Sequence, residues 1–222
     1  MKLYYDPIST TSRPVVMFLH EAKIKADLVP VSLFQDEHKT AEYAAINPNQ
    51  AVPVLQDGAF TLTESSAILK HLADMAGDPS YPTDPLARAR VNQAMDWFNT
   101  GFYRDFGYGL VYSRILPEYG FANPMTQADL LRRAQERSER WLAVLDAGLA
   151  DQSFLCGDAP TIADLMGASY VSIGDWIGFD LSPWPNVGRW MSAMRERPCW
   201  TETHEAWNGL VNMLRDQQRQ SA

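Results

Sequence analysis

The spacing of apolar positions changes several times in the first third of the chain. Short apolar runs predict strands, and apolar residues three or four positions apart predict helices. Turn signals at Asp6-Pro7, Asn47-Pro48 and Asp57-Gly58 separate these elements. The predicted strands are Lys2–Tyr5, Asp27–Val31, Val52–Leu55 and Ala59–Leu62, and the predicted helices are Pro14–Ala22, Thr40–Ile46 and Ser65–Met75. This order, βαβ-α-ββα, predicts a small α/β domain over residues 1–77.

The remainder of the chain has a helical pattern throughout. A polar, proline-rich segment at residues 78–85 predicts a linker, and a second domain over residues 86–222 follows it. The predicted helices are Leu86–Ile115, Ala128–Ala150, Ile162–Trp176, Val187–Arg197 and Trp200–Gln217. The expected fold class is therefore α+β with two domains, an α/β N-terminal domain and an all-helical C-terminal domain.

Composition and charge exclude several classes of function. Apolar residues make up 46% of the chain and charged residues 21%, as in ordinary soluble proteins. The net charge of −8 argues against nucleic-acid binding, because phosphate contacts need clustered Lys and Arg. Cys156 and Cys199 have no metal-ligand or disulfide-framework spacing, so no metal is expected. The N-terminus has no secretory signal or membrane-spanning run, so we expect a cytoplasmic protein without a membrane partner.

A run of hydroxyl side chains lies between the first predicted strand and the first helix. Residues Ser9–Ser12 are Ser-Thr-Thr-Ser, and Pro14 suits the first helical position. Hydroxyls in this place cap a helix. The free N–H groups of a helix start also favour an anion, including a thiolate. This segment alone leaves both roles open.

Three other segments likewise have both a structural and a ligand-binding interpretation. At Val52-Pro53, a proline directly before a buried strand marks the start of that strand. A cis bond there would instead turn the Val52 backbone towards a peptide ligand. Only about 5–6% of X-Pro bonds are cis. Glu64 and Ser65 open a helix, where they either satisfy the helix end or bind the head group of an α-amino acid. His38-Lys39 lies in a polar loop and is either solvated surface or a site for a terminal carboxylate.

Together and in this order, these segments resemble the glutathione-binding domain of the cytosolic glutathione transferases, which is a thioredoxin-like fold. The serine-using classes are most similar, namely theta and its bacterial relatives, including the dichloromethane dehalogenases. The resemblance implies a cis bond before Pro53. It also implies that Glu64 and Ser65 bind the γ-glutamyl head of glutathione, that His38 and Lys39 bind its glycyl carboxylate, and that the protein is a homodimer.

The resemblance further implies that one hydroxyl bonds the glutathione sulfur. We expect Ser9, because it lies four residues before Arg13, as the theta-class serine lies before its arginine. Ser12 is the second choice, and Thr10 and Thr11 stay open. Relatives commonly have Gln or Lys directly before the Val-Pro pair, whereas this chain has Ala51 there and Gln50 one place earlier. Gln50 is therefore expected among the glutathione ligands, together with Val52 and Pro53.

A second resemblance lies in the C-terminal half, at Thr161-Ile-Ala-Asp164. Its spacing is that of a capping box with Asp in place of Glu or Gln. The family has this box at the start of its buried core helix, where it is thought to assist folding. The likeness therefore extends from about Lys2 to Arg197.

The expected function is transfer of glutathione, as co-substrate, to a small apolar electrophile, with Ser9 stabilising the thiolate. Four aromatic residues cannot all point one way on a single helix, so we expect a substrate pocket at Phe102, Phe106, Tyr108 and Tyr112. The absence of Cys-x-x-C before the first helix excludes thioredoxin-type chemistry. The alternatives are a non-catalytic binding protein of this fold, a glutathione-dependent disulfide reductase or peroxidase, and a dehalogenase-like activity.

Overall fold

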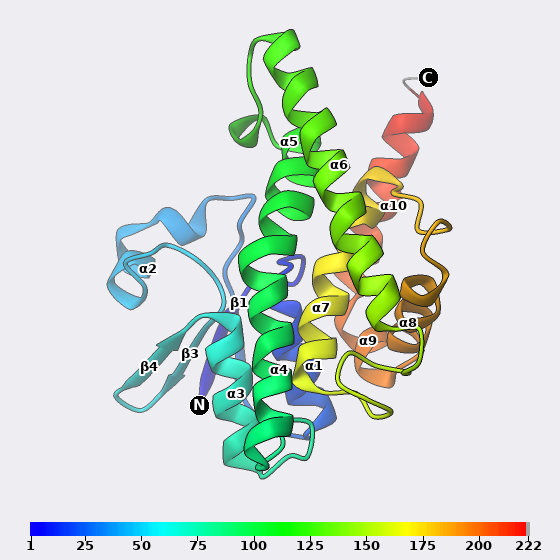
Figure 1. Cartoon of the computed structure of the whole chain (residues 1–222). Coiled ribbons are helices and arrows are strands. Elements are labelled where there is room, and N and C mark those ends of the chain that lie inside the picture. The colour runs from blue at the N-terminus through cyan, green and yellow to red at the C-terminus, as the bar shows by residue number, and fades with distance from the viewer. Residues whose placement is uncertain (221–222) are drawn as a thin grey trace.

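The N-terminal part of the protein forms a four-stranded sheet with three helices. The computed structural model describes residues 1–220 (Figure 1). The strand order is β2-β1-β3-β4, with β1 and β2 parallel and the other neighbours antiparallel. The elements are β1 (Lys2–Tyr5), α1 (Arg13–Glu21), β2 (Asp27–Pro30), a short 3₁₀ turn η1 (Glu37–Lys39), α2 (Ala41–Ile46), β3 (Val54–Asp57), β4 (Phe60–Thr63) and α3 (Ser65–Ala76). The predicted βαβ-α-ββα order is confirmed.

The two faces of the sheet are covered by different helices because successive side chains of a strand point to opposite faces. Leu3 and Leu55 belong to a large core shared with α1 and α3. Their neighbours Tyr4 and Val54 instead join Tyr43 of α2 in a small separate core. The central strands β1 and β3 therefore have a core on each face, whereas the edge strands β2 and β4 are largely exposed.

The C-terminal part is helical, as predicted. Its elements are α4 (Pro85–Trp97), η2 (Phe98–Tyr112), α5 (Ser113–Ile115), η3 (Pro117–Tyr119), α6 (Pro124–Gly148), α7 (Ile162–Ser172), η4 (Ile173–Ile177), α8 (Pro185–Arg195), α9 (Pro198–Thr203) and α10 (Glu205–Gln220). Every residue of α7 is buried, so this helix is the centre around which the others pack. It also contacts α1 and α3, so one continuous core joins the two parts of the molecule (Figure 1).

Residues between α3 and α4 make specific contacts. Gly77 takes a positive φ of 61° after α3, and Asp84 caps α4 by accepting hydrogen bonds from the N–H groups of Leu86 and Ala87. The Tyr81 side chain is buried and donates to Asn92. The segment is thus packed against the helices. The domain division at residues 78–85 stays a prediction.

Two helix predictions were wrong in their continuity. The expected helix Leu86–Ile115 is α4 followed by η2, a π-helical segment with i→i+5 hydrogen bonds, and then α5. The expected helix Trp200–Gln217 is two helices, α9 and α10, with His204 between them. The imidazole of His204 is buried and contacts Arg13 of α1 and the Trp200 carbonyl of α9.

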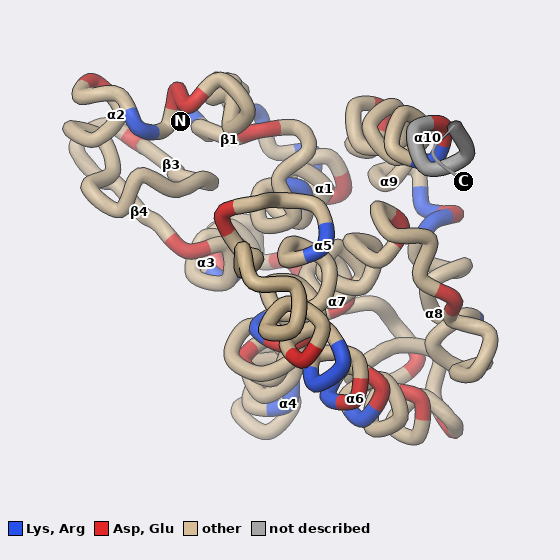
Figure 2. Tube along the Cα trace, turned by 90° about the horizontal axis from the view of Figure 1, so that it is seen from above, with Lys and Arg blue, Asp and Glu red and all other residues tan. Residues whose placement is uncertain are grey.

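Charged residues are dispersed over the surface. Figure 2 shows Lys and Arg interleaved with Asp and Glu, most densely on α6. There Arg132 pairs with both Asp129 and Glu136, and Arg133 pairs with Asp129. No helix within residues 1–220 has an apolar stretch that could span a bilayer.

Candidate active site

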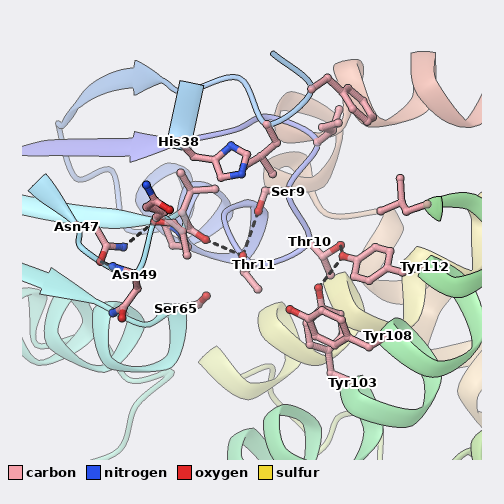
Figure 3. Close-up of a pocket in the computed structure, with 18 of the residues that line it drawn as sticks. Ser9, Thr10, Thr11, His38, Asn47, Asn49, Ser65, Tyr103, Tyr108 and Tyr112 are labelled. Atoms are coloured by element: carbon pink, nitrogen blue, oxygen red, sulfur yellow. Dashed lines mark hydrogen bonds between the residues drawn. The ribbon is translucent and has the colours of Figure 1, made fainter. Parts of the chain in front are cut away.

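A cavity of about 620 Å³ lies between the N-terminal sheet and the helical part (Figure 3). Its size is within the range of small-molecule sites. One wall comes from the loop after β1, the Val52-Pro53 segment and the start of α3, and the other from η2 and η4. Of the predicted site residues, those that line it are Ser9, His38, Lys39, Gln50, Val52, Pro53, Glu64, Ser65, Tyr108 and Tyr112.

The Ser9 hydroxyl is hydrogen-bonded to other residues of its own segment. Ser9 Oγ accepts the Ser12 N–H at 3.2 Å and lies 3.0 Å from Thr11 Oγ1. Thr11 has a single hydroxyl proton and donates it to the Val52 carbonyl at 2.9 Å. Thr11 Oγ1 can then only accept, so the Ser9 hydroxyl donates to Thr11 in this structure and would have to turn away from Thr11 to donate to a ligand in the cavity.

The other two hydroxyls of the segment have different surroundings. Ser12 is fully buried, does not line the cavity, and accepts the Asp6 N–H at 3.4 Å. Thr10 lines the cavity, but its hydroxyl lies 3.2 Å from the Tyr112 hydroxyl (Figure 3). The geometry therefore favours Ser9 over Ser12 as the donor to a bound sulfur.

Tyr112 is the middle of a chain of hydroxyls. Its oxygen lies 2.6 Å from that of Tyr103, in addition to its contact with Thr10 (Figure 3). Burial raises the pKa of both phenols, that of Tyr103 well above its usual value. Both tyrosines therefore stay protonated at neutral pH and act as hydrogen-bond donors in the cavity.

The backbone around Pro53 is tightly constrained. The Val52-Pro53 bond is cis, as the resemblance implies. The Val52 carbonyl accepts from Thr11, so this group, which we expected to face the ligand, is already engaged within the protein. The carbonyl of the preceding residue, Ala51, accepts from Tyr43 and Asn47. These bonds fix the loop that forms the floor of the cavity.

Positive φ angles cluster around this cavity. Four non-glycine residues within 1–220 have φ between 52° and 68°, and three of them, Asp36, Gln50 and Glu64, line the cavity. Such conformations are unfavourable for side chains with a Cβ and are concentrated at functional sites. The strain supports a ligand site at this cavity.

The start of α3 has no side-chain cap. Glu64 occupies the cap position, but its carboxylate accepts no hydrogen bond from the helix end. The capping role that the sequence left open is therefore not the one Glu64 performs. The uncapped N–H groups favour a carboxylate at this point, and the exposed Glu64 side chain stays available for an ammonium group.

The loop with η1 presents one free and one paired basic group. His38 Nδ1 is buried and has no hydrogen-bond partner among the described residues. Lys39 is exposed and forms an ion pair with Asp36 at 2.7 Å. Gln50 Nε2 donates to the Lys39 carbonyl and so holds the loop in place. His38 is thus the better-placed partner for a terminal carboxylate.

The residue spacing in η2 divides its aromatic side chains between core and cavity. The i→i+5 bonds of this segment give more residues per turn than the 3.6 of an α-helix. In such a helix, residues at successive spacings of four, five and four positions lie on the same face. This face lines the cavity, and its members are Asn99, Tyr103, Tyr108 and Tyr112.

The expectation that Phe102 and Phe106 line a substrate pocket was wrong. Both side chains are fully buried in the core, where Phe102 stacks on Trp97 and Phe106 contacts Phe179. Tyr103 and Asn99 were missed, because only the wider turn places them on the cavity face. Trp176 and Tyr119 also line the cavity from η4 and η3, and no local pattern in the sequence indicated them.

Gly107 makes room for the Tyr103 ring. A Cβ at this position would lie 2.4 Å from a carbon of that ring, which is buried and stacked on Tyr170 at 4.3 Å. We expect Gly107→Ala to lower the free energy of unfolding by up to about 2 kcal/mol, since overpacking costs ~1–3 kcal/mol and the helix gains ~1 kcal/mol. Urea denaturation measures this difference.

Gly188→Ala is the matched control for this substitution. Gly188 lies inside α8, and a Cβ there would meet no atom within 4 Å. The same chemical change should therefore leave the protein equally stable or up to ~1 kcal/mol more stable. Equal effects at positions 107 and 188 would show that the Tyr103 ring is not held by this contact.

Comparison with known proteins identifies the family. Residues 8–75 match the model of the glutathione S-transferase N-terminal domain, and residues 112–198 match that of the C-terminal domain. Human glutathione S-transferase theta-2 is 34% identical over 183 residues, covering 82% of this chain and 74% of that protein. The chain belongs to the glutathione S-transferase family.

Other members of the glutathione S-transferase family agree with this assignment. Glutathione S-transferase D7 of Drosophila melanogaster is 29% identical, covering 98% of this chain and 95% of that protein. The structure of a delta-class glutathione transferase of Nilaparvata lugens is similar with a TM-score of 0.84 and 30% identity, covering 97% of this chain and 98% of that one. The resemblance to a theta-like glutathione transferase and the two-part fold inferred from the sequence are both confirmed.

Proposed function

We propose that this protein binds glutathione in the cavity and transfers it to an apolar electrophile, with Ser9 stabilising the thiolate. The observation that supports this most directly is the Ser9 hydroxyl at the start of α1, which lines the cavity and would turn from Thr11 to donate to a bound sulfur. The bound thiol loses its proton to solvent, and the thiolate forms a C–S bond as the leaving group departs or a strained ring opens. Ser9 acts as a hydrogen-bond donor and orienter, so no general base is needed.

The remaining contacts of glutathione follow from the shape of the cavity. The γ-glutamyl carboxylate would lie on the uncapped start of α3 at Ser65, and its ammonium group beside Glu64. The glycyl carboxylate would lie near His38, with Lys39 and Gln50 at the rim. The peptide in between would pass Val52 and Pro53. All of these residues line the same cavity.

One hydrogen bond from Ser9 is strong enough to make the glutathione thiolate a major species at neutral pH. A glutathione thiol resembles a free cysteine, with a pKa near ~8.5, and is mostly protonated at neutral pH. A hydrogen bond to a charged group contributes about 1.5–3 kcal/mol. Since one pKa unit is about 1.4 kcal/mol, Ser9 would lower the thiol pKa by about one to two units. Thiolate then becomes a major species at neutral pH.

The electrophile would occupy the aromatic side of the cavity. Tyr103, Tyr108, Tyr112 and Trp176 form this wall, and their rings contact one another. An apolar or aromatic electrophile fits such a wall.

A glutathione titration followed by an electrophile panel tests the proposal. The wild-type protein should bind glutathione and conjugate it to at least one member of a panel of haloalkanes, aryl halides, epoxides and enones. Turnover confined to peroxides or disulfides would indicate the peroxidase or reductase alternative. Binding without turnover would indicate a non-catalytic binding protein, and absence of binding would contradict the proposal altogether.

We also propose that the protein is a cytoplasmic homodimer. Large apolar side chains are exposed on β4, α3 and α4, namely Phe60, Met75 and Leu86. An isologous contact across these elements would cover them. Both cysteines are unpaired, as is usual in a reducing compartment. Light scattering should give about twice 25.0 kDa, and a monomeric mass at micromolar concentration would contradict the dimer.

A further inference from the structure

Arg13, the first residue of α1, is a buried cation in the centre of the molecule. Its side chain is 0% exposed. The guanidinium donates to Ser172 Oγ at 3.1 Å and to the Ser169 carbonyl at 3.2 Å, and lies 3.5 Å from the centre of the Trp207 ring. Its Nε has no partner among the described residues. The N-terminal helix thus inserts a charged group between α7 and α10.

The fourth contact of the Arg13 guanidinium is with His204, which is also a neutral group. Arg13 Nη1 lies 2.6 Å from His204 Nε2, and His204 Nδ1 lies 2.9 Å from the Trp200 carbonyl. A carbonyl only accepts, so Nδ1 carries the ring proton and Nε2 accepts from Arg13. Burial and the charge of Arg13 lower the pKa of His204 to about 2, so the imidazole is uncharged at neutral pH.

Arg13 therefore has a charge without a contacting carboxylate. Burial lowers its pKa to about 9, which still leaves the guanidinium protonated at neutral pH. No carboxylate within residues 1–220 forms an ion pair with it. Asp175 of η4 is the carboxylate that attracts it from a distance, and Asp175 is itself paired with Arg195 of α8 at 2.9 Å. A buried, uncompensated charge is costly, so an anion nearby would be strongly favoured.

Arg13 reaches the cavity wall through two stacked rings, since its guanidinium lies on Trp207, and Trp207 stacks at 5.0 Å on the cavity residue Trp176. The charge of Arg13 lowers the pKa of Tyr112, against the larger effect of burial. Besides His204 and Asp175, Tyr103 and Tyr112 are titratable groups that interact with Arg13. Tyr112 contacts Thr10, the residue next to Ser9. An anion held by these hydroxyls thus lies within the influence of the Arg13 charge.

We propose that Arg13 is the buried counter-charge of the glutathione thiolate. This rests on the proposed function and deepens it. Arg13 does not touch the substrate. It acts through space across the stacked Trp207 and Trp176 rings, while its neutral contacts hold the guanidinium in place without cancelling its charge. If the role of Arg13 were purely structural, its hydrogen bonds alone would matter. A carboxylate added so that these bonds are preserved would then leave the thiol pKa unchanged.

Ser172→Asp and Ser172→Asn separate these two roles while Arg13 stays in place. Either side chain can accept from Nη1 in place of the serine hydroxyl, but only Asp adds a negative charge. A unit charge acting from beyond direct contact shifts a pKa by about one unit at the effective dielectric of protein sites. We expect Ser172→Asp to raise the thiol pKa of bound glutathione by about one unit and to lower kcat/KM about tenfold on the acid side of the profile. Ser172→Asn should leave the thiol pKa at the wild-type value.

The readouts are the ultraviolet absorbance of the thiolate and the pH profile of kcat/KM, with binding of S-methylglutathione as a check. This thioether has no ionisable thiol, so both variants should bind it as the wild type does. Equal thiol pKa values in folded Asp and Asn variants would overturn the inference. A wild-type protein that binds glutathione without lowering its thiol pKa would instead contradict Ser9 activation, and with it the proposed function.

A second pair of variants at the other end of the same contact provides an independent test. Arg13→Lys keeps the charge and should keep most of the thiol pKa shift, whereas Arg13→Gln should raise the thiol pKa as Ser172→Asp does. This pair decides the question if a substitution at position 172 prevents folding. Equal losses of thiolate in the Lys and Gln variants would show that the shape of the arginine matters and its charge does not.

Discussion

Ser9→Ala should lower turnover at pH 7 by about ten- to a hundred-fold while leaving glutathione affinity nearly unchanged. In the proposed function the hydroxyl bonds the sulfur chiefly when the sulfur is charged, so its loss removes about 1.5–3 kcal/mol from the thiolate and little from the neutral thiol. The thiol pKa should rise by one to two units. The pH–rate profile shifts upwards by the same amount, and activity returns in part at high pH, where the thiol ionises without assistance. Steady-state kinetics across pH measures all three effects.

Ser12→Ala is the control for this experiment. Ser12 lies in the same segment but is fully buried outside the cavity, where it accepts the Asp6 N–H. Its removal should lower stability and leave the pH–rate profile in place. A shifted profile for Ser12→Ala with an unshifted one for Ser9→Ala would reverse the assignment. If neither variant shifted the profile, Thr10, Thr11 or the backbone N–H groups would activate the sulfur.

The fold was predictable because its determinants are local. Alternation places Leu3 and Leu55 on one face of the sheet and Tyr4 and Val54 on the other, so strand identity and burial follow from neighbouring residues. The predicted helix and strand order of the N-terminal part is confirmed throughout. The π-helical η2 was not predictable, because its apolar repeat through Phe98, Phe102 and Phe106 also fits an α-helix.

The candidate site was predictable only where family motifs supply it. Ser9, Pro53 and Glu64 lie on short segments whose spacing resembles that of the glutathione transferases, and all three line the cavity. The aromatic wall depends instead on how η2 and η4 turn against the sheet. The surroundings of Arg13 come from residues 156 to 191 positions away, so no local pattern could indicate its burial.

Asp164→Ala should lower the free energy of unfolding by about 3–5 kcal/mol. The Asp164 carboxylate is fully buried and accepts four hydrogen bonds, from the Leu155 N–H, the Thr161 N–H and hydroxyl, and the Trp190 indole N–H, at 2.7–3.0 Å. The alanine variant leaves these donors without a partner, at about 1–3 kcal/mol for each one that stays buried, and the losses are less than additive. Asp164 does not line the cavity, so folded variant protein should bind glutathione as the wild type does.

Denaturant unfolding measures the Asp164 effect, and Asp158→Ala in the loop before α7 is its control. Asp158 is an exposed acidic residue, so its removal should change the free energy of unfolding by no more than about 0.5 kcal/mol. Because Asp164 joins the start of the central helix α7 to α8 through Trp190, its loss should loosen both at once and shift the midpoint of the whole transition. A loss below about 1 kcal/mol would mean that water reaches the freed donors, and that this carboxylate is not what fixes the start of α7.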